Sequence, residues 1–456
     1  DGLLDAMDHA VLSGVIDEVA DYPGRYRFTH IFTQQALAGQ LSQTRRTLLH
    51  VSIGEALERL YAEDIMPHAA ELARHFGEAA ALTGSDRQVR YCVLAGEHAL
   101  ATYAYEEALA QFQRAFEAKT GQASPKDAQL SPNPRATDQA LAEILFGLGR
   151  SQRATATFQM QEAWVSLSKA FEYNVQVGDI PQVVDVAEHL PVTEHMRTTE
   201  MLAHALTLVP SGSHFEGRLL SRYGNAINYE KGDYDSARLA FDRAMEIAKR
   251  ERDVALEMRT TTYAACLDGE HLRVHESLSN SLRTVELARL VVNPQAELLA
   301  RFWAATAHYS LGESSHAVAH AAACLNLAGR LRVPSQLTTA LWTNETLARL
   351  QGDWKAAKAY SEQGLELAPY DSRLLSSRLL LEYQAGDPAE GKIFLERMLE
   401  VMRQEEAGPD LEFALPAITL PLVARFAGGD LDAAGEAART VLSADSVSPS
   451  LALLAR

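Results

Sequence analysis

The sequence has few cysteines and a shortage of positive charge. Cys92, Cys266 and Cys324 are the three cysteines among 456 residues, and their wide separation excludes a disulfide scaffold and a cysteine-rich zinc module. Lys and Arg number 42 against 60 Asp and Glu, a net charge of −18. This excess of acids argues against nucleic-acid binding, because phosphate contacts need clustered basic side chains. No uncharged apolar run approaches the roughly 18 residues of a membrane span. We therefore expect a cytoplasmic chain without direct contact to nucleic acid or membrane.

The sequence also lacks the motifs of common active sites. No phosphate-binding P-loop is present: the one Gly-Lys pair, Gly391-Lys392, is followed by Ile393, so this chain has no means of holding a triphosphate in that way. His271 and His275 are four residues apart, as are His316 and His320, and such pairs can meet a metal on one helix face. With 15 histidines in the chain we interpret both pairs as packing or solvated side chains. The sequence thus predicts no enzyme, no cofactor and no metal site on this chain.

The chain is rich in Ala and Leu, which favours an all-α protein. A glycine followed by an acidic residue recurs, with steps of 54, 37, 43, 40, 34 and 43 residues, at Gly178, Gly232, Gly269, Gly312, Gly352, Gly386 and Gly429. Such periods are typical of helical-hairpin repeats. Glycine supplies the left-handed conformation that ends one helix, and the acid can cap the next. Five residues after most of these glycines stands Ala or Gly, as close helix crossing requires.

Three segments carry a specific resemblance. Residues 234–250, YDSARLAFDRAMEIAKR, resemble the second helix of a tetratricopeptide repeat, with Ala237, Phe241 and Ala244 at its small, aromatic and small positions. Residues 105–118 and 354–369 are similar. The resemblance implies a right-handed solenoid over 139–456, with first helical repeats at 61–119. The stretch 120–138 is rich in Pro, Ser and Asn, which predicts a loop or linker. A generic α-solenoid is the alternative.

Residues 1–60 resemble the winged-helix module of the signal-transduction ATPases called STAND proteins. Residues 15–30 contain a Tyr-Pro-Gly-Arg turn and predict a short β-hairpin. The residues that carry the resemblance are Arg27-Phe28-Thr29-His30, followed by an apolar helix. A DNA-reading role is disfavoured, since the helix from Ile31 to Gln40 contains no Lys or Arg.

The same resemblance implies a nucleotide-sensing role for Arg27 and His30. In STAND relatives the histidine of a Met-His-Asp motif contacts the β-phosphate of ADP. Here Thr29 replaces the Met and Ile31 replaces the Asp, which puts the supporting role of the Asp in doubt. The alternative is a histidine that caps the hairpin or fills the helix start. ADP or ATP would bind to an NTPase module of the full-length protein, because this chain has no P-loop.

Alignment of the repeats on their glycines predicts a partner-binding groove. Three residues before the glycines stand Tyr229, Cys266, Tyr309, Arg349, Tyr383 and Phe426. Seven residues earlier, on the same helix face, stand Arg222, Arg259, Phe302, Trp342, Ser376 and Thr419. We expect a partner-binding surface centred on Phe302, Tyr309, Trp342, Arg349 and Tyr383, because aromatic and Arg clusters are typical binding anchors. Packing of these side chains between neighbouring first helices is the alternative.

Two functions follow from the sequence. The first is the sensor region of a STAND-class regulator, in which the solenoid binds a protein, a peptide or a small inducer and the winged helix gates an upstream NTPase. The second is a plain tetratricopeptide interaction scaffold without a linked ATPase.

Overall fold

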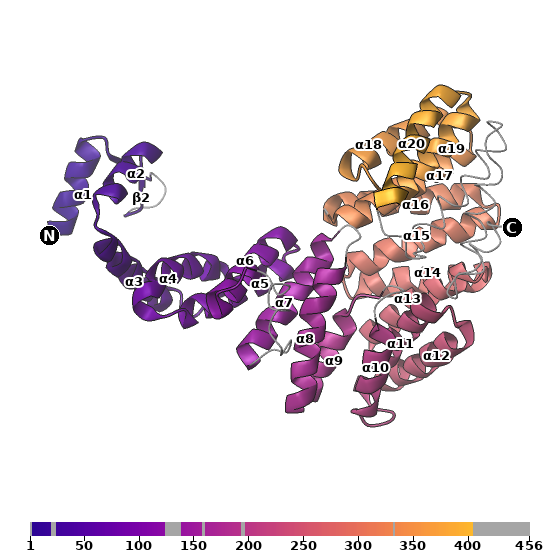
Figure 1. Cartoon of the computed structure of the whole chain (residues 1–456), viewed down its shortest axis with the longest axis horizontal. Helices are drawn as coiled ribbons and strands as arrows, with labels where there is room; N and C mark the ends of the chain where they lie inside the picture. Colours follow the sequence, from indigo (N-terminus) through magenta and orange to yellow (C-terminus); the bar gives the residue numbers. More distant parts are fainter. Residues whose placement is uncertain are drawn as a thin grey trace. The chain divides into compact units, whose positions relative to one another are not determined.

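The computed structural model describes residues 2–19, 24–123, 138–156, 160–192, 197–331 and 333–404. Within these ranges the chain forms twenty α-helices, one 3-10 helix and one two-stranded hairpin (Figure 1). It divides into two compact units, Asp1–Ser124 and Pro125–Arg456. None of the helices in the described ranges is long and apolar enough to cross a membrane. The predicted all-α fold is confirmed, while the predicted solenoid residues after 404, with Thr419 and Phe426, lie outside the described residues.

The first unit begins with a helix, a hairpin and two further helices. Strands β1 and β2 pair antiparallel, with Ile16 opposite Phe28 and Glu18 opposite Tyr26, which confirms the predicted hairpin. The elements of this unit are α1 (Gly2–Leu12), β1 (Ile16–Glu18), β2 (Tyr26–Phe28), α2 (Ile31–Gln40), α3 (Gln43–Leu60), η1 (Met66–His68), α4 (Ala69–Thr83), α5 (Asp86–Ala101) and α6 (Tyr105–Thr120).

Aromatic rings set against glycines close the helix pairs of this unit. The ring of Phe112 in α6 lies against Gly96 of α5, where an added Cβ would stand 2.6 Å from it. Phe76 of α4 lies against Gly54 of α3 in the same way, at 2.9 Å. The missing side chain lets each pair of helices approach closely. Helix α6 is the segment whose sequence resembles a tetratricopeptide helix, and its Ala108, Phe112 and Ala115 are fully buried.

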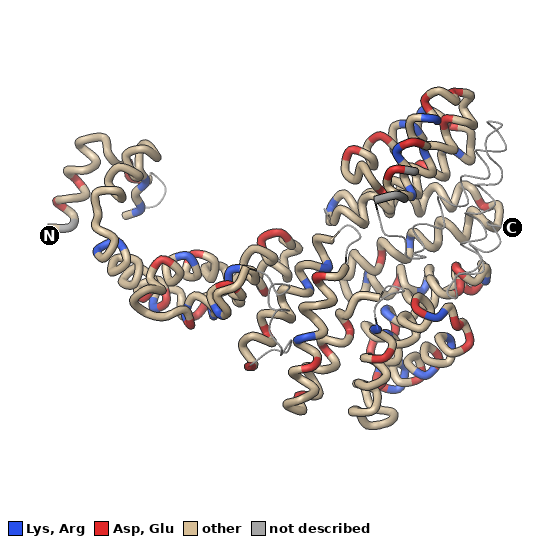
Figure 2. Tube along the Cα trace, viewed as in Figure 1, with Lys and Arg blue, Asp and Glu red and all other residues tan. Residues whose placement is uncertain are grey.

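The second unit consists of consecutive helices that pack mainly as pairs. We call the two members of each pair the first and the second helix. The first helix of one pair also contacts the first helix of the next pair: α11 contacts α13, and α13 contacts α15. Lys and Arg are interspersed with Asp and Glu along these helices (Figure 2). The helices are α7 (Gln139–Thr155), α8 (Gln161–Val177), α9 (Ile180–His189), α10 (Thr198–Thr207), α11 (His214–Lys231), α12 (Tyr234–Glu251), α13 (Val254–Glu270), α14 (Val274–Leu290), α15 (Pro294–Ser310), α16 (Ser314–Leu331), α17 (Pro334–Leu350), α18 (Trp354–Leu367), α19 (Ser372–Ala385) and α20 (Pro388–Gln404).

Five of the predicted turn glycines have the left-handed backbone that ends a helix. Their φ angles lie between 60° and 86° at Gly178, Gly232, Gly312, Gly352 and Gly386. The acid that follows caps the next helix where it is Asp: Asp233 accepts from the Ser236 amide and Asp353 from the Ala356 amide, both at 3.0 Å. Small residues five positions on, such as Ala237 and Ala317, are fully buried where the helices cross.

Two features of the repeat pattern differ from the prediction. Gly269 lies inside α13, and Leu272, with φ 60°, makes the left-handed turn instead. The 54-residue step from Gly178 to Gly232 contains three helices, α9, α10 and α11, because Gly178 ends α8, the second helix of its pair, whereas Gly232 ends α11, the first helix of its pair. The glycine spacing alone therefore misplaced one turn and did not show that Gly178 lies between two helix pairs.

Candidate binding surfaces

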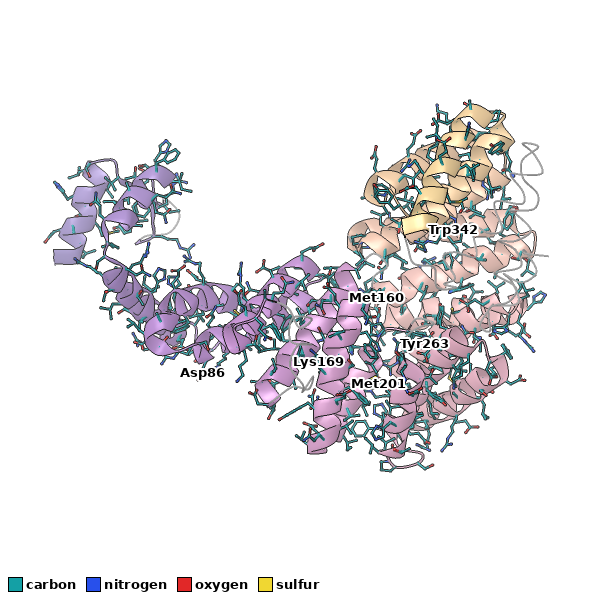
Figure 3. All side chains as sticks on the ribbon, viewed as in Figure 1. Asp86, Met160, Lys169, Met201, Tyr263 and Trp342 are labelled. Carbon is teal, nitrogen blue, oxygen red and sulfur yellow. The ribbon has the colours of Figure 1, made fainter. Side chains whose placement is uncertain are left out.

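The five residues of the predicted groove lie on α15, α17 and α19, and all five are half-buried. The rings of Phe302 and Trp342 join two of these helices, with centroids 6.3 Å apart. Trp342 (Figure 3) also packs against the core formed by Leu374, Leu375 and their neighbours. Trp342 therefore contributes to the packing of the repeats as well as to the aromatic pair.

The other three residues make contacts within the repeats. Tyr309 packs against a core cluster that includes Ala317 and Ala321 of α16. Tyr383 lies against Gly391 of α20, where an added Cβ would stand 2.8 Å from its ring. Arg349 stands 3.3 Å from the buried Glu345 carboxylate and donates to Gln384 at 3.2 Å. These contacts show what the side chains do in the free protein, and partner binding by the five stays a prediction.

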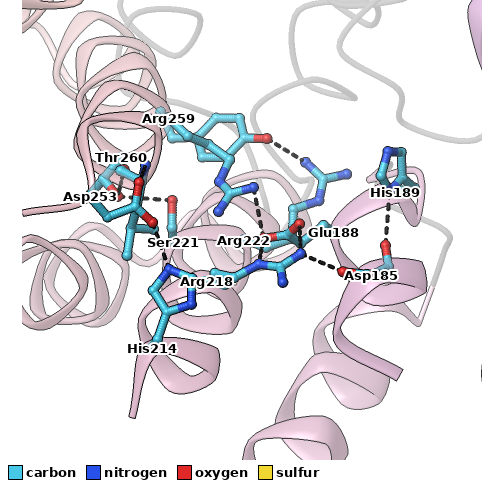
Figure 4. Close-up of polar contacts among 12 residues, drawn as sticks. Asp185, Glu188, His189, His214, Arg218, Ser221, Arg222, Asp253, Arg259 and Thr260 are labelled. Atoms are coloured by element: carbon cyan, nitrogen blue, oxygen red, sulfur yellow. Dashed lines mark hydrogen bonds and ion pairs between the residues drawn. The ribbon is translucent and has the colours of Figure 1, made fainter. Parts of the chain in front are cut away.

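A cluster of arginines lies earlier in the series of first helices, among α7, α9, α11 and α13. We call it the arginine cluster: Arg150, Arg153, Arg218, Arg222 and Arg259 around Asp185, Glu188, His189 and Tyr263. Glu188 is clamped by two of the arginines: Arg218 Nε donates to it at 2.8 Å, and Arg259 Nη1 lies 2.7 Å away (Figure 4). Arg218 also contacts Asp185 at 2.7 Å.

Two of the remaining arginines contact a backbone carbonyl and aromatic side chains. Arg222 donates to the Leu190 carbonyl and, at 3.2 Å, to the hydroxyl of Tyr263, a side chain marked in Figure 3. Arg150 lies over the Phe146 ring at 4.3 Å, and Phe146 meets His189 edge to face. Within the described residues, Asp185 and Glu188 are the carboxylates that contact Arg218 and Arg259 of this cluster.

The positive charges of the arginines change the pKa values of two neighbouring side chains, His189 and Tyr263. Burial, with Arg153, Arg150 and Arg222, lowers the pKa of His189 to about 3, so this imidazole is neutral. Burial acts to raise the pKa of Tyr263, but Arg222, Arg259 and Arg153 outweigh it and lower that pKa. Both shifts have the sign that a positive field produces.

Three histidines and one glutamate meet where α15 turns into α16. His308 Nδ1 lies 2.6 Å from Glu313 Oε2, and His316 Nδ1 lies 3.8 Å from the same oxygen. The His308 ring stands 5.1 Å from that of His316 and 5.3 Å from that of His320. The sequence had paired His316 with His320, and the structure adds His308 from the preceding helix.

The two nucleotide-sensing residues predicted near the N-terminus are exposed. Arg27 lies in β2, opposite Asp17. His30 precedes α2, makes no side-chain capping bond and stacks on Phe32 at 6.1 Å. The apolar side chains of Ile31 and Phe32 are 61% and 71% exposed, and α2 buries none of its residues. A helix that buries no residue lacks the tertiary packing that normally stabilises it.

Sequence reasoning missed the arginine cluster and the third histidine. Arg222 and Arg259 were placed on the expected face, but their link to Glu188 and His189 depends on α9, the first helix of a pair that the glycine spacing did not resolve. His308 and His316 lie four residues before and after Gly312. Residues equally distant from a helical-hairpin turn face each other, so this symmetry was the signal that could have found the site.

No protein-family model matches the sequence, and no curated protein sequence is significantly similar to it. Among solved structures, a Rap protein in complex with competence and sporulation factor is 12% identical, with a TM-score of 0.45 over 80% of this chain and 99% of that one. Cut9 in the APC/C Cut9–Hcn1 hetero-tetramer is 13% identical, with a TM-score of 0.42 over 90% and 75%. A STAND protein with a tetratricopeptide repeat sensor from Pyrococcus horikoshii is 13% identical, with a TM-score of 0.45 over 93% and 68%. These likenesses are too weak to carry function, and the helix pairs described above make the chain a tetratricopeptide-like helical repeat protein without a matching sequence family.

Proposed function

We propose that this chain is a protein-interaction module whose second unit binds an acidic peptide segment of a partner at the arginine cluster. The observation that supports it is that three guanidinium groups, those of Arg218, Arg222 and Arg259, gather beside Asp185 and Glu188 (Figure 4) on a chain whose net charge is −18. Guanidinium groups recognise carboxylates with two parallel hydrogen bonds. Glu188, held by Arg218 and Arg259, is an internal example of that contact.

A peptide display library tests this proposal with the chain as it exists. We expect selected peptides to be enriched in Asp and Glu and to bind more weakly as salt rises, because the attraction is electrostatic. Arg259→Ala should weaken a selected peptide at least tenfold. Arg283→Ala on the second helix α14, where the side chain is 47% exposed and pairs with Glu257, is the matched control. Peptides without acidic residues, or equal binding by both variants, would refute the proposal.

The proposal is one of binding, with no chemistry assigned to this chain. The residues predicted as a groove, on α15, α17 and α19, extend the same series of first helices and offer a continuation for a longer peptide. The three cysteines are buried free thiols, which suits the reducing cytoplasm that the composition predicts.

A second candidate function is more specific: the chain is the sensor region of a regulator and gates a STAND-class NTPase. The exposed apolar side chains of α2 favour it, because apolar side chains on a helix that buries nothing favour a covering surface. In this proposal α2 docks on the nucleotide-binding module, and His30 and Arg27 approach the phosphates of ADP. In the full-length protein, His30→Ala should release ADP faster and raise basal activity. Unchanged ADP retention would count against this role, and the interaction scaffold would stand without it.

A further inference from the structure

The cluster between α15 and α16 has the donor set of a metal site. Two imidazoles and one carboxylate, those of His308, His316 and Glu313, each offer a ligand atom, and all three atoms lie within 4.8 Å of one another. Imidazole nitrogen with carboxylate oxygen is a common ligand set of Zn²⁺. None of the residues of the arginine cluster takes part, so the site is independent of the peptide surface.

The distances are close to those of a tetrahedral ion. Zn²⁺ bonds of about 2.0–2.1 Å place neighbouring ligand atoms about 3.3 Å apart. The His308 to Glu313 separation of 2.6 Å would lengthen, and the His316 to Glu313 separation of 3.8 Å would shorten, each by less than about 1 Å on that geometry. The side chains of Glu313 and His316 are 47% and 68% exposed. They are therefore free to make this adjustment, while the buried His308 anchors the site.

A third histidine supports the assignment. His320 lies one helical turn beyond His316 on α16, and its ring stacks on that of His308 at 5.3 Å. Its Nδ1 atom is buried without a hydrogen-bond partner. A buried nitrogen without a partner is costly in a packed helix pair, and a metal or a metal-bound water beside it would remove that cost.

The surrounding charges do not prevent cation binding. Arg301 and Arg289 are the two arginines whose positive charges affect His320. Both are paired with the same carboxylate, that of Glu297, at 2.7 Å and 3.1 Å. Glu313 itself is contacted by the two histidines.

We propose that His308, Glu313 and His316 bind one Zn²⁺ ion that clips the end of α15 to the start of α16, with His320 beside it. Three protein ligands leave one coordination position for water or for a side chain of a partner. The clip would hold the turn at Gly312 closed and stabilise that repeat, because an ion that binds the folded state alone stabilises it by mass action.

The test titrates the untagged, chelator-treated chain with Zn²⁺ alone, in competition with a chromophoric chelator. We expect one tight equivalent and a higher midpoint of thermal unfolding with Zn²⁺ present. His316→Ala and Glu313→Gln should each weaken this binding at least tenfold. Both side chains are exposed enough that the variants should fold, which a far-ultraviolet circular dichroism spectrum checks.

His275→Ala is the matched control, since His275 is an exposed histidine near the start of the second helix α14. It should bind Zn²⁺ as the wild type does. Co²⁺ gives a second readout, because a tetrahedral site produces intense visible absorption bands that His316→Ala should abolish. Uptake of less than one equivalent, or equal loss of binding in His275→Ala and His316→Ala, would overturn the proposal.

Discussion

Trp303 of α15 packs directly on Gly269 of α13, and its ring leaves no space there for a side chain. The contact joins the first helices of two successive repeats. Gly269 has an ordinary helical backbone, so a larger residue is opposed by its neighbours, the Trp303 ring and the Ser277 hydroxyl. We predict that Gly269→Ala lowers the free energy of unfolding by about 1–3 kcal/mol through overpacking, measured as a lower urea midpoint.

Gly329→Ala in α16 is the control for this change. Gly329 is also helical, but nothing lies within 4 Å of an added Cβ. Alanine should raise stability there by up to about 1 kcal/mol, because it favours helix over glycine. A stabilising effect of alanine at both positions would contradict the prediction, because it would show that the Trp303 ring can move aside without a loss of stability.

The Asp233 cap predicts a local dependence on pH. Its carboxylate accepts from the Ser236 hydroxyl and amide, and these bonds lower its pKa below the ordinary 3.8. A lowered folded pKa stabilises the fold above pH 3.8, and that contribution is lost as the pH falls through the folded pKa. Asp233→Ala should cost about 1 kcal/mol at pH 7, measured by urea unfolding.

Asp233→Asn separates the cap from its charge. The amide oxygen still accepts from the backbone at every pH, so most of the stability at pH 7 should remain. The difference between wild type and Asp233→Asn should shrink further in acid. If Asp233→Asn and Asp233→Ala were equally destabilising, helix capping would not explain the contribution of Asp233 to stability.

Local rules explain which parts of this fold the sequence predicts. Left-handed glycines such as Gly232, and aspartates such as Asp233, act within one turn, so spacing finds them. Glu313 and Gly269 fit the same pattern but serve tertiary contacts, with His308 and with Trp303. The role of Gly269 depends on which helices meet across repeats, whereas Glu313 meets His308 within one repeat. The fold class was therefore predictable, and the symmetry of His308 and His316 about Gly312 could have indicated the histidine site, while the arginine cluster depends on contacts between repeats that spacing does not give.

His189 should make the second unit sensitive to acid. The pKa of this imidazole falls from 6.5 to about 3 in the folded chain, through burial and the nearby Arg153, Arg150 and Arg222. Its contribution is full above pH 6.5 and is lost progressively as the pH falls toward 3, because the unfolded chain binds the proton first. We predict that His189→Gln loses less stability than the wild type between pH 7.5 and pH 5.5. Equal losses in urea unfolding would contradict this assignment.

Arg349 and Glu345 show how a residue predicted for partner binding also supports the core. Glu345 is fully buried and accepts from the Ser377 hydroxyl. Burial raises the pKa of Glu345, and Arg349 acts in the opposite direction. The two side chains stand 3.3 Å apart, and that of Arg349 is 10% exposed. Removal of Arg349 would therefore leave a buried carboxylate without its cation.

We predict that Arg349→Ala destabilises the chain by about 3 kcal/mol at pH 8, since an unpaired buried charge is costly. The loss should be smaller at pH 5, close to the ordinary pKa of 4.5. A raised folded pKa gives stability below the ordinary 4.5 that is lost as the pH rises through the folded pKa, and without Arg349 that pKa moves higher still. Glu345→Gln combined with Arg349→Ala should recover most of the loss, because the amide still accepts from Ser377 and carries no charge. Urea unfolding of both single variants and the double variant, at both pH values, gives the coupling between the two residues. Additive effects that do not change with pH would show that Arg349 contributes by its packing and not by its charge.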